Sequence, residues 1–268
     1  MEDNLSLKGK TILVTGVSRS MGIGAGIVKR LAVAGANVIC HGNSAYDVQL
    51  AYMDASEQYA KELADQLKKE GNQIHVLPTS DLVMEGVPEQ VVEQAVKIYG
   101  HLDGIVLNHA YSTSNPIGEW TMEHINAHLH TNVTASMLMI QAFAKQLPQG
   151  KTGSVTLFTS GQYLGPMVNE IAYCVSKDAI IGLCRQTAAA LAKQKIRVNC
   201  INPGATDTGY LMPESDSYQM VASMFPSGRW GMPEDAAKLV QFLQSDFSAW
   251  ITGQIIASEG GFDRYREC

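Results

Sequence analysis

A tyrosine and a lysine at helical spacing are the residues of this sequence best suited to acid-base chemistry. Tyr173 and Lys177 lie four positions apart in a segment of helical periodicity, so their side chains share one helix face. A nearby ammonium favours the phenolate and would bring a tyrosine pKa of about 10 closer to neutral pH. Such a phenol suits proton exchange with a carbonyl or alcohol oxygen. On spacing alone, however, such a pair arises by chance more often than not.

A hydroxyl group precedes this pair in the chain. Ser160 directly follows an apolar, strand-like run at residues 154–159 and lies thirteen positions before Tyr173. At the end of a strand that leads to the helix of Tyr173, its side chain could hydrogen-bond the same substrate oxygen.

A glycine-rich turn near the N-terminus is typical of a phosphate cradle. Residues 15–24 read Thr-Gly-Val-Ser-Arg-Ser-Met-Gly-Ile-Gly, between a β-branched run at 11–15 and helical periodicity from 23 to 34. Glycines let the backbone approach a pyrophosphate, and a helix N-terminus supplies free N–H donors and partial positive charge. The strand-turn-helix context favours a dinucleotide site over a plain tight turn, although the spacing departs from the simplest fingerprint.

Strand-like and helix-like segments alternate from end to end. We expect strands at residues 11–15, 37–41, 73–78, 103–107, 154–159, 196–201 and 254–257, and helices at 23–34, 56–70, 88–99, 121–146, 171–193 and 233–244. Short, nearly continuous apolar strands between helices indicate an α/β fold with one doubly wound parallel sheet, the Rossmann arrangement, covered by helices on both faces. Because no linker interrupts the pattern, we expect residues 1–268 to form a single domain.

Two connections are longer than this rhythm requires. They span residues 42–54 and 203–230, and both follow expected strands, at the sheet edge where ligands bind. We expect a substrate lid at about 203–230. Its large apolar side chains are open to two interpretations, packing beneath the lid or an apolar cover for a nonpolar substrate; they are Tyr210, Leu211, Met212, Met220, Met224 and Phe225.

Composition excludes several classes of function. Asp and Glu outnumber Lys and Arg by 26 to 20, a formal net charge of -6, which makes nucleic acid an unfavourable partner. No run of 18 apolar residues predicts a membrane span, and an acidic N-terminus with a short first apolar run argues against a secretory signal. The five cysteines have no C-x-x-C spacing, so reduced thiols and a cytoplasmic location are expected.

Several motifs in a fixed order resemble the short-chain dehydrogenase/reductase family over nearly the whole chain. They are Thr15-Gly16 with Gly22-Ile-Gly24, Asp81-Leu82, Asn108-His-Ala110, Asn132, Ser160, Tyr173-x3-Lys177, Pro203-Gly204 with Thr208, Ile251-Thr-Gly253, and Gly260-Gly261. Within the family, the sequence is most similar to bacterial 3-oxoacyl-carrier-protein reductases. It departs from the common pattern in the Ser20-Met21 expansion of the glycine loop and in Asn-His-Ala-Tyr at 108–111.

The resemblance implies a catalytic tetrad of Asn132, Ser160, Tyr173 and Lys177. The tyrosine would exchange the substrate proton, the lysine would lower its pKa and hold the nicotinamide ribose, the serine would orient the carbonyl, and the asparagine would hold a water. Cofactor contacts are expected from Gly16, Ser18, Arg19, Gly22, Ile23, Gly24, Asn43, Ser44, Asp81, Leu82, Asn108, Ala110, Tyr173, Lys177, Pro203, Gly204, Thr206 and Thr208. Asp81 would face the adenine amino group.

The end of the second expected strand bears on the choice of cofactor. Sites that prefer NAD usually carry an acid there, but residues 40–44 read Cys-His-Gly-Asn-Ser. Arg19, Asn43 and Ser44 could instead receive a 2′-phosphate. We therefore favour NADP, reduced as NADPH, over NAD. The alternative is that Arg19 is a solvated loop residue and that the pocket tolerates either cofactor.

Other chemistry has weaker support. His124, His128 and His130 share a helix, but no acid or cysteine completes a metal site, so we expect no metal and a helix-surface or subunit-contact role. No Gly-x-Ser-x-Gly elbow supports a serine hydrolase. Lys151, Lys193 and Lys195 form at most a weak docking patch for an acidic carrier protein.

The favoured function is NADPH-dependent reduction of a ketone or a 3-oxoacyl thioester to a secondary alcohol. The alternatives are an NADP-binding regulator without turnover, which would not need the Tyr/Lys pair, and an alcohol dehydrogenase working oxidatively. An enoyl reductase ranks low because that related branch has six residues between its Tyr and Lys. The resemblance also implies a homotetramer, or failing that a dimer, in which helices 121–146 and 171–193 pair with their copies and the last strand and C-terminal tail form a second contact.

Overall fold

A computed structural model describes residues 5–50 and 52–262 of the chain. Seven parallel strands form one sheet in the order β3-β2-β1-β4-β5-β6-β7. The strands are β1 (Thr11–Thr15), β2 (Asn37–His41), β3 (Ile74–Val76), β4 (Gly104–Leu107), β5 (Gly153–Phe158), β6 (Ile196–Asn202) and β7 (Ile255–Ala257). The predicted α/β fold with a doubly wound parallel sheet is confirmed. Cys268 and the C-terminal tail expected at a subunit contact lie outside the described residues.

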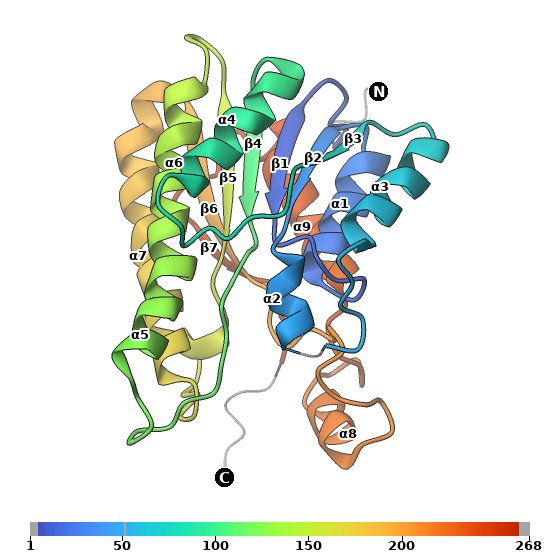
Figure 1. Ribbon diagram of the computed structural model, residues 1–268, viewed down its shortest axis with the longest axis vertical. Helices are drawn as coiled ribbons and strands as arrows, with labels where there is room; N and C mark the ends of the chain where they lie inside the picture. The colour runs from blue at the N-terminus through green and yellow to red at the C-terminus, as the bar shows by residue number, and fades with distance from the viewer. Residues whose placement is uncertain (1–4, 51, 263–268) are drawn as a thin grey trace.

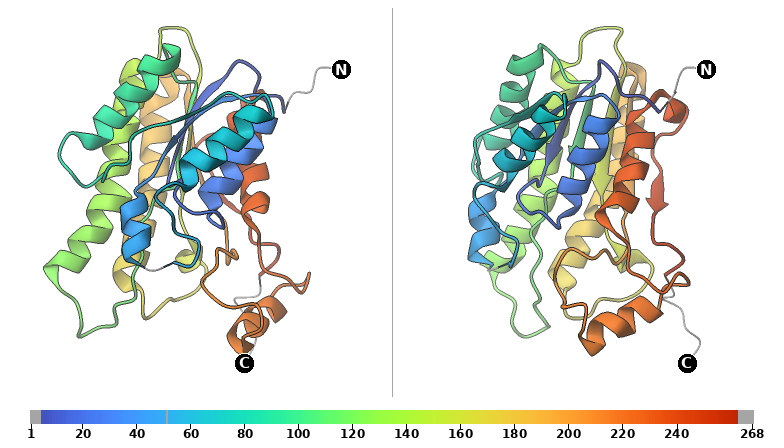
Figure 2. Two further views of the ribbon diagram at one scale, coloured as in Figure 1. Left: turned by 45° about the vertical axis from the view of Figure 1, so that its right-hand side comes forward. Right: turned by 90° about the vertical axis from the view of Figure 1, so that its right-hand side faces the viewer.

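Helices cover both faces of the sheet, as Figures 1 and 2 show. On one face lie α1 (Ile23–Val33), α3 (Tyr59–Lys69) and α9 (Pro233–Gln244), and their apolar side chains form one core. On the other face lie α4 (Val87–Tyr99), α6 (Ala135–Gln146) and α7 (Ile171–Leu191), with a second core. Every residue of β1, β4 and β5 is buried. This two-sided burial explains why these strands read as continuous apolar runs rather than alternating ones.

Close packing of α1 on α9 fixes the helix that follows the glycine-rich turn. A Cβ on Gly26 would meet Pro233 Cβ at 2.8 Å, so a side chain larger than hydrogen would push the two helices apart. The N-terminus of α1 is thereby held at the sheet edge where β1 and β4 end. In this strand order the chain continues from β1 to one side and from β4 to the other, so a crevice opens between them.

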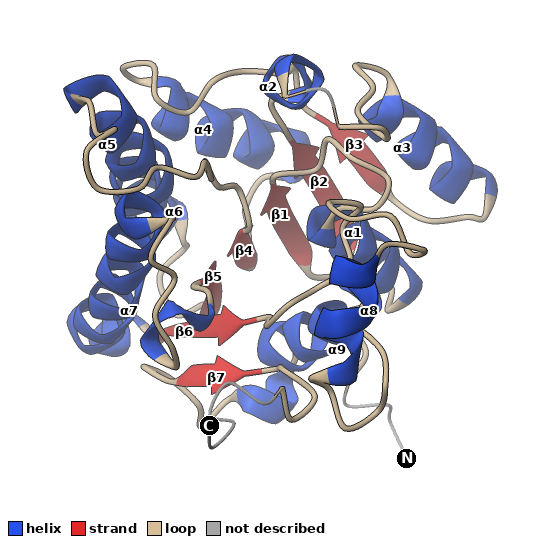
Figure 3. Ribbon diagram, turned by 90° about the horizontal axis from the view of Figure 1, so that it is seen from below, coloured by secondary structure: helices blue, strands red, loops and turns tan. Residues whose placement is uncertain are grey.

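Two helices lie in the long connections that the sequence left without regular structure. They are α2 (Ser44–Gln49), after β2, and α8 (Asp216–Ser223), after β6. Figure 3, seen from below, shows α8 over α9, to one side of the strands. Shorter 3₁₀ turns are η2 (Gly161–Tyr163), η3 (Ala192–Gln194) and η4 (Asp246–Ser248).

The helix expected over residues 121–146 is interrupted in its middle. It consists of α5 (Met122–His128), a π-helical turn η1 (Leu129–Thr134) and α6. A π-turn inserts one extra residue per turn and often marks a functional position. Here it holds Asn132. Periodicity does not reveal such a turn, because the apolar pattern continues through it.

Candidate active site

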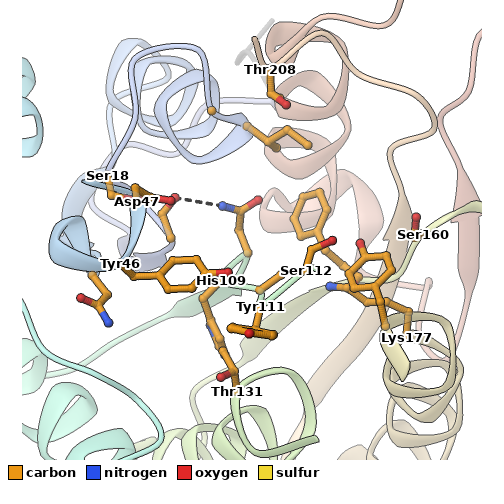
Figure 4. A pocket seen from close by; sticks show the side chains of 18 of the residues that line it. Ser18, Tyr46, Asp47, His109, Tyr111, Ser112, Thr131, Ser160, Lys177 and Thr208 are labelled. Atoms are coloured by element: carbon orange, nitrogen blue, oxygen red, sulfur yellow. Dashed lines mark hydrogen bonds between the residues drawn. The ribbon is translucent and has the colours of Figure 1, made fainter. Parts of the chain in front are cut away.

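One cleft of about 960 Å³ gathers most of the residues that the sequence singled out. It lies at the carboxyl ends of the strands. The predicted residues that line it are Gly16, Ser18, Arg19, Gly22, Ile23, Asn43, Asp81, Leu82, Asn108, Ala110, Ser160, Tyr173, Lys177, Pro203, Gly204, Thr206 and Thr208. Three do not line it: Gly24, Ser44 and Asn132. Figure 4 shows Ser18 and Asp47 at one side of the cleft and Ser160 and Lys177 at the other.

The glycine-rich turn fits a phosphate group. Gly16 adopts a φ of +72°, and a Cβ there would meet Asn108 Nδ2 at 2.8 Å. Gly22 begins α1 without a side-chain cap, and the first turn of α1 has no acidic residue. The free N–H groups and the partial positive charge of this helix end therefore face the cleft. Gly24 contributes differently from our expectation, because it supports the turn by packing under the Gly16 carbonyl.

Arg19 is not a solvated loop residue. Its Nε donates to Asp54 Oδ1 at 2.9 Å, and its Nη2 donates to the Thr208 carbonyl. The guanidinium lies 3.7 Å from the centre of the Tyr52 ring. Arg19 is 8 % exposed. These contacts join the glycine-rich turn to both long connections, so the arginine has a structural role besides any contact with a ligand.

A carboxylate that sequence reasoning missed lies at the same end of the cleft. Asp47 of α2 accepts a hydrogen bond from the Ser18 hydroxyl and is buried. Residues 40–44 have no acid, but the helical turn after Ser44 brings Asp47 back to the glycine-rich turn. The observation that residues 40–44 carry no acid is therefore true of that stretch, but it missed a carboxylate three positions further along the chain. A short helix in the connection would have been the signal to look for.

The Thr15 hydroxyl and the Asn108 side-chain amide fasten the segment after β4 to the end of β1. Thr15 Oγ1 accepts from the Asn108 N–H at 3.1 Å and the His109 N–H at 3.3 Å, and it donates to the Val106 carbonyl. Its oxygen also lies 2.7 Å from His109 Nδ1. Burial, with the charges of Lys177 and His41, lowers the pKa of His109 to about 3. The imidazole is therefore neutral, and it lines the cleft next to the lysine.

Tyr173 and Ser160 meet at the opposite end of the cleft. Burial raises the pKa of the Tyr173 phenol, and a hydrogen bond with Ser160 opposes this shift only in part. The sequence led us to expect a lowered pKa. Desolvation of the phenolate outweighs the polar contacts here. The phenol is therefore protonated at neutral pH and suited to donate a proton.

Lys177 is buried one turn further along α7. Its Nζ donates to the Phe158 carbonyl at 3.0 Å and lies 5.6 Å from the centre of the Tyr173 ring. Burial lowers its pKa to about 8. Lys177 is only 4 % exposed, and this burial is why the ammonium loses its proton in a range close to neutral pH.

Asn132 does not line the cleft but contacts residues that form its wall. Its Oδ1 accepts from the Tyr111 N–H at 2.7 Å, and its Nδ2 donates to the Tyr111 carbonyl at 3.0 Å and to Ser176 Oγ at 2.8 Å. The side chain thus ties the segment after β4 to α7. With these bonds made, the side chain positions Tyr111 and α7 rather than reaching the cleft.

An aromatic row crosses the cleft. The Tyr111 ring lies 5.5 Å from that of Tyr46 and 4.7 Å from that of His128, and His128 lies 6.4 Å from Tyr173. His128 is fully buried, so the helix-surface role we expected for it is wrong. Its Nδ1 donates to the His124 carbonyl, and its Nε2 accepts from the Thr113 N–H. The sequence missed Tyr46 and Tyr111 as wall residues.

The connection after β6 contributes few of its apolar side chains to the cleft. Tyr210 and Leu211 line it, whereas Met212 and Met220 are more than half exposed. Phe225 is buried against Phe262. Of the two interpretations left open, a methionine-rich cover over the cleft is not seen, because Met212 and Met220 point to solvent. The remaining wall beside Tyr173 includes Tyr111, Ser112, Glu123, Asn126, His130, Met167, Glu170 and Trp230.

The described residues contain neither a candidate metal-ligand cluster nor a candidate membrane-spanning helix. Within residues 5–50 and 52–262 there is no cluster of three or more His, Cys, Asp or Glu side chains that could hold a metal ion. In the same residues no helix has the length and apolar character needed to cross a bilayer.

Comparison with known proteins gives matches over almost the full chain. A family model described as "Enoyl-(Acyl carrier protein) reductase" matches residues 16–263. The 3-oxoacyl-[acyl-carrier-protein] reductase FabG of Aggregatibacter actinomycetemcomitans is 32% identical over 253 residues, which cover 94% of this chain and 98% of that protein.

Two solved structures share the fold. A short-chain dehydrogenase/reductase from Serratia marcescens BCRC 10948 has a TM-score of 0.84 and 29% identity, covering 96% of this chain and 98% of that one. A blue fluorescent protein from a metagenomic library, solved in complex with NADPH, has the same TM-score and identity and covers 96% and 99%.

Proposed function

Because this chain belongs to the short-chain dehydrogenase/reductase family, and is thus an NAD(P)-dependent oxidoreductase, we propose that it reduces a ketone or 3-oxoacyl group with NADPH. The product is a secondary alcohol. The observation that carries this proposal is the position of the Tyr173 phenol in the cleft, beside Ser160 and one helical turn from a buried Lys177, at the end opposite the phosphate cradle.

In the proposed reaction each residue has one task. A nicotinamide cofactor held in the cleft would supply hydride to the carbonyl carbon. Ser160 and Tyr173 hydrogen-bond the carbonyl oxygen, and Tyr173 donates its proton as negative charge develops there. Lys177 offsets the charge left on the phenolate. Asn132 positions Tyr111 and α7, so the proposed tetrad includes one member that acts through its neighbours rather than at the reacting atoms.

The preference for NADPH rests on Arg19. Its guanidinium lines the cleft near Asn43 and Thr208, at the end where the adenosine 2′-phosphate would lie. A second cofactor, NAD, is favoured by one observation, the buried Asp47 carboxylate on Ser18, because a carboxylate can hold ribose hydroxyls and repels a phosphate. Ser44 does not line the cleft, so we propose that it supports α2 and does not contact the cofactor.

Two other activities are weaker candidates. A regulator that binds NADP without turnover would not need a proton donor beside a buried ammonium. An alcohol dehydrogenase working oxidatively needs a phenolate as base, and burial of Tyr173 opposes that form. The family model carries the description of an enoyl reductase, but that branch has six residues between its Tyr and Lys. Tyr173 and Lys177 are separated by three residues, so their spacing does not match that branch.

The organisation of the protein is part of the same proposal. Residues 1–268 form one NAD(P)-binding domain, and residues 203–230 form a lid over the cleft. The assembly is a homotetramer built on the helices that carry Asn132 and Tyr173. We place the protein in the cytoplasm, a proposal supported by the free thiols of Cys40, Cys174, Cys184 and Cys200 in the described chain.

Loss of NADPH absorbance with a panel of ketones and 3-oxoacyl thioesters tests the proposal. Tyr173→Phe keeps the ring and removes the acidic proton, so we expect the rate to fall about 10²- to 10⁴-fold while NADPH affinity stays within a few-fold. Tyr163→Phe, at an exposed position outside the cleft lining, is the matched control. Activity of Tyr173→Phe within tenfold of the wild type would contradict the assignment.

A further inference from the structure

The cleft wall beside Tyr173 carries a carboxylate with no partner of its own. Glu170 lines the cleft three positions before Tyr173. Among the described residues, no hydrogen bond or ion pair is made by its side chain. It is half-buried, and burial raises the pKa of its carboxyl group. A carboxylate in such a place gains from any hydrogen-bond donor that enters the cleft.

The backbone holds Glu170 in position before a ligand arrives. The Asn115 N–H and the Ser114 hydroxyl both donate to the Asn169 carbonyl, at 2.7 and 3.0 Å. The Glu170 N–H donates to the Met167 carbonyl, and its own carbonyl accepts from the Cys174 N–H in the first turn of α7. The segment after β4 and the segment before α7 therefore form one fixed rim, and the carboxylate stands on it.

The charges around Glu170 do not neutralise it. The cleft lining also includes Glu123, which is exposed, and the polar residues His130, Ser112 and Asn126. Among the described residues that line the cleft, the Lys and Arg side chains are Lys177, which is buried on the Phe158 carbonyl, and Arg19, which pairs with Asp54 at the cofactor end. Neither of these cations forms an ion pair with Glu170.

We propose that Glu170 recognises the substrate through a hydrogen-bond donor next to the carbonyl group. The inference rests on the proposed ketone reduction and narrows its substrate class. Glu170 caps the N-terminus of α7 three positions before Tyr173, and its charge is one of those that raise the pKa of the Tyr173 phenol, so a group one or two carbons from a carbonyl held by Tyr173 lies within reach of Glu170. Hydroxy ketones and amino ketones share the required chemistry. Free keto acids are repelled, and plain ketones leave the buried carboxylate without a donor.

Four ketones of matched size test this, each offered with NADPH and with NADH: hydroxyacetone, aminoacetone, 2-butanone and pyruvate. The readout is the ratio of kcat/KM for each compound to that for 2-butanone. We expect both donor compounds at least tenfold above 2-butanone in the wild type, and pyruvate below it.

Two variants separate the two kinds of donor. Glu170→Ala should lower the hydroxyacetone and aminoacetone ratios about tenfold or more and raise the pyruvate ratio. Glu170→Gln keeps an acceptor oxygen without the charge, so it should preserve the ratio for a hydroxyl and lose that for an ammonium. Glu119→Gln, an exposed acid on the same rim outside the cleft, is the control and should alter no ratio. Equal changes for all four compounds in Glu170→Ala would overturn the inference.

A binding measurement keeps this test separate from the proposed function. If no ketone consumes either cofactor, ketone reduction fails, but the shift of Tm by each compound still reports recognition. Hydroxyacetone or aminoacetone should then raise the Tm of the wild type more than that of Glu170→Ala. An equal shift in the two proteins would refute the role of Glu170.

Discussion

Burial, more than the neighbouring ammonium, sets the proton affinity at the end of the cleft where Tyr173 lies. The Tyr173 phenol and the Lys177 ammonium are both desolvated, and desolvation favours the neutral form of each. The pair therefore starts with its proton on the tyrosine. This arrangement supplies an acid for reduction at neutral pH. Because the pKa of Lys177 lies close to neutral pH, a cofactor phosphate or ribose brought into the cleft would change the protonation of this lysine.

The pH dependence of reduction should report Lys177. Its pKa is lowered to about 8, so the ammonium is present below that pH and is lost as the pH rises through it. We expect kcat/KM for reduction to fall as the pH rises above about 8, because the developing phenolate loses its neighbouring charge. Lys177→Arg keeps a charge throughout this range and should move the fall upward. A fall at the same pH in the wild type and in Lys177→Arg would assign it to another group.

Cofactor choice at the residue scale depends on Arg19. Arg19→Ala should raise KM for NADPH about tenfold to a hundredfold, the usual value of charge-assisted hydrogen bonds to a phosphate. KM for NADH should change much less. Steady-state kinetics with both cofactors measures this. Equal effects on both would mean that the arginine serves to join Asp54, Tyr52 and Thr208 instead.

Asp47→Asn is the matched change on the opposing carboxylate. It removes the charge that faces the same end of the cleft and keeps an acceptor for Ser18. If NADPH is the cofactor, this variant binds NADPH at least as well as the wild type. A selective loss of NADH binding would favour the alternative that Asp47 holds ribose hydroxyls.

At the scale of elements, the cleft depends on segments that are far apart in the chain. The connections after β2 and β6 meet through Tyr52 and Tyr210, whose rings lie 5.4 Å apart, and the guanidinium of Arg19 in the glycine-rich turn faces both rings. Asn132 in the π-turn performs a similar task between the segment after β4 and α7. Each junction uses polar side chains to hold loops that have no strand or helix partners.

The junction between β1 and the segment after β4 gives a stability prediction. Thr15→Val leaves the Asn108 and His109 N–H groups without their acceptor in a buried place. We expect a loss of about 1–3 kcal/mol in the free energy of unfolding. For a chain of this size that lowers Tm by about 2–4 °C per kcal/mol.

Thr11→Val is the control for this change, and calorimetry measures both variants. Thr11 is buried on the same strand, but its hydroxyl accepts one long bond of 3.4 Å from Asn37. It should therefore cost less than Thr15→Val. Equal losses would show that the polar junction adds nothing beyond burial of a threonine.

For the whole molecule, the outer surface of α6 and α7 carries the proposed subunit contact. A shallow apolar groove lies between these helices, and Met137 at its edge is 53% exposed. Of the alanines in the second helix, Ala189 and Ala190 face outward. Ala188 is buried in the core, so it does not belong to this outer surface.

Light scattering tests the tetramer. A glutamate at the centre of an apolar contact is costly, so Met137→Glu should lower the mass from that of a tetramer to that of a dimer or monomer. Val33→Glu, at an exposed position on α1, is the control and should leave the mass unchanged. A wild-type protein that is fully active as a monomer at assay concentration would remove the proposal.

The sequence by itself determined the order of the strands along the chain, the sheet type and the residues gathered at one edge. Hydrophobic runs with period-specific spacing reflect burial, and burial on both faces leaves an unambiguous pattern, so β1, β2, α1 and α9 fall within a residue of their expected bounds. The Tyr173/Lys177 pair could be found because one helix fixes its spacing. The relative position of two residues on one helix follows from local geometry and can therefore be predicted from the sequence.

Tertiary structure decided everything that depends on which segments come together. Asp47, Tyr111 and Glu170 carry no local signal, because their significance comes from loops folding back onto the cleft. The direction of the Tyr173 pKa shift follows from desolvation by neighbours that are distant in sequence, which spacing cannot report. Arg19 looked like a free cation in the sequence and acquires Asp54, Tyr52 and Thr208 as partners only when the chain is folded.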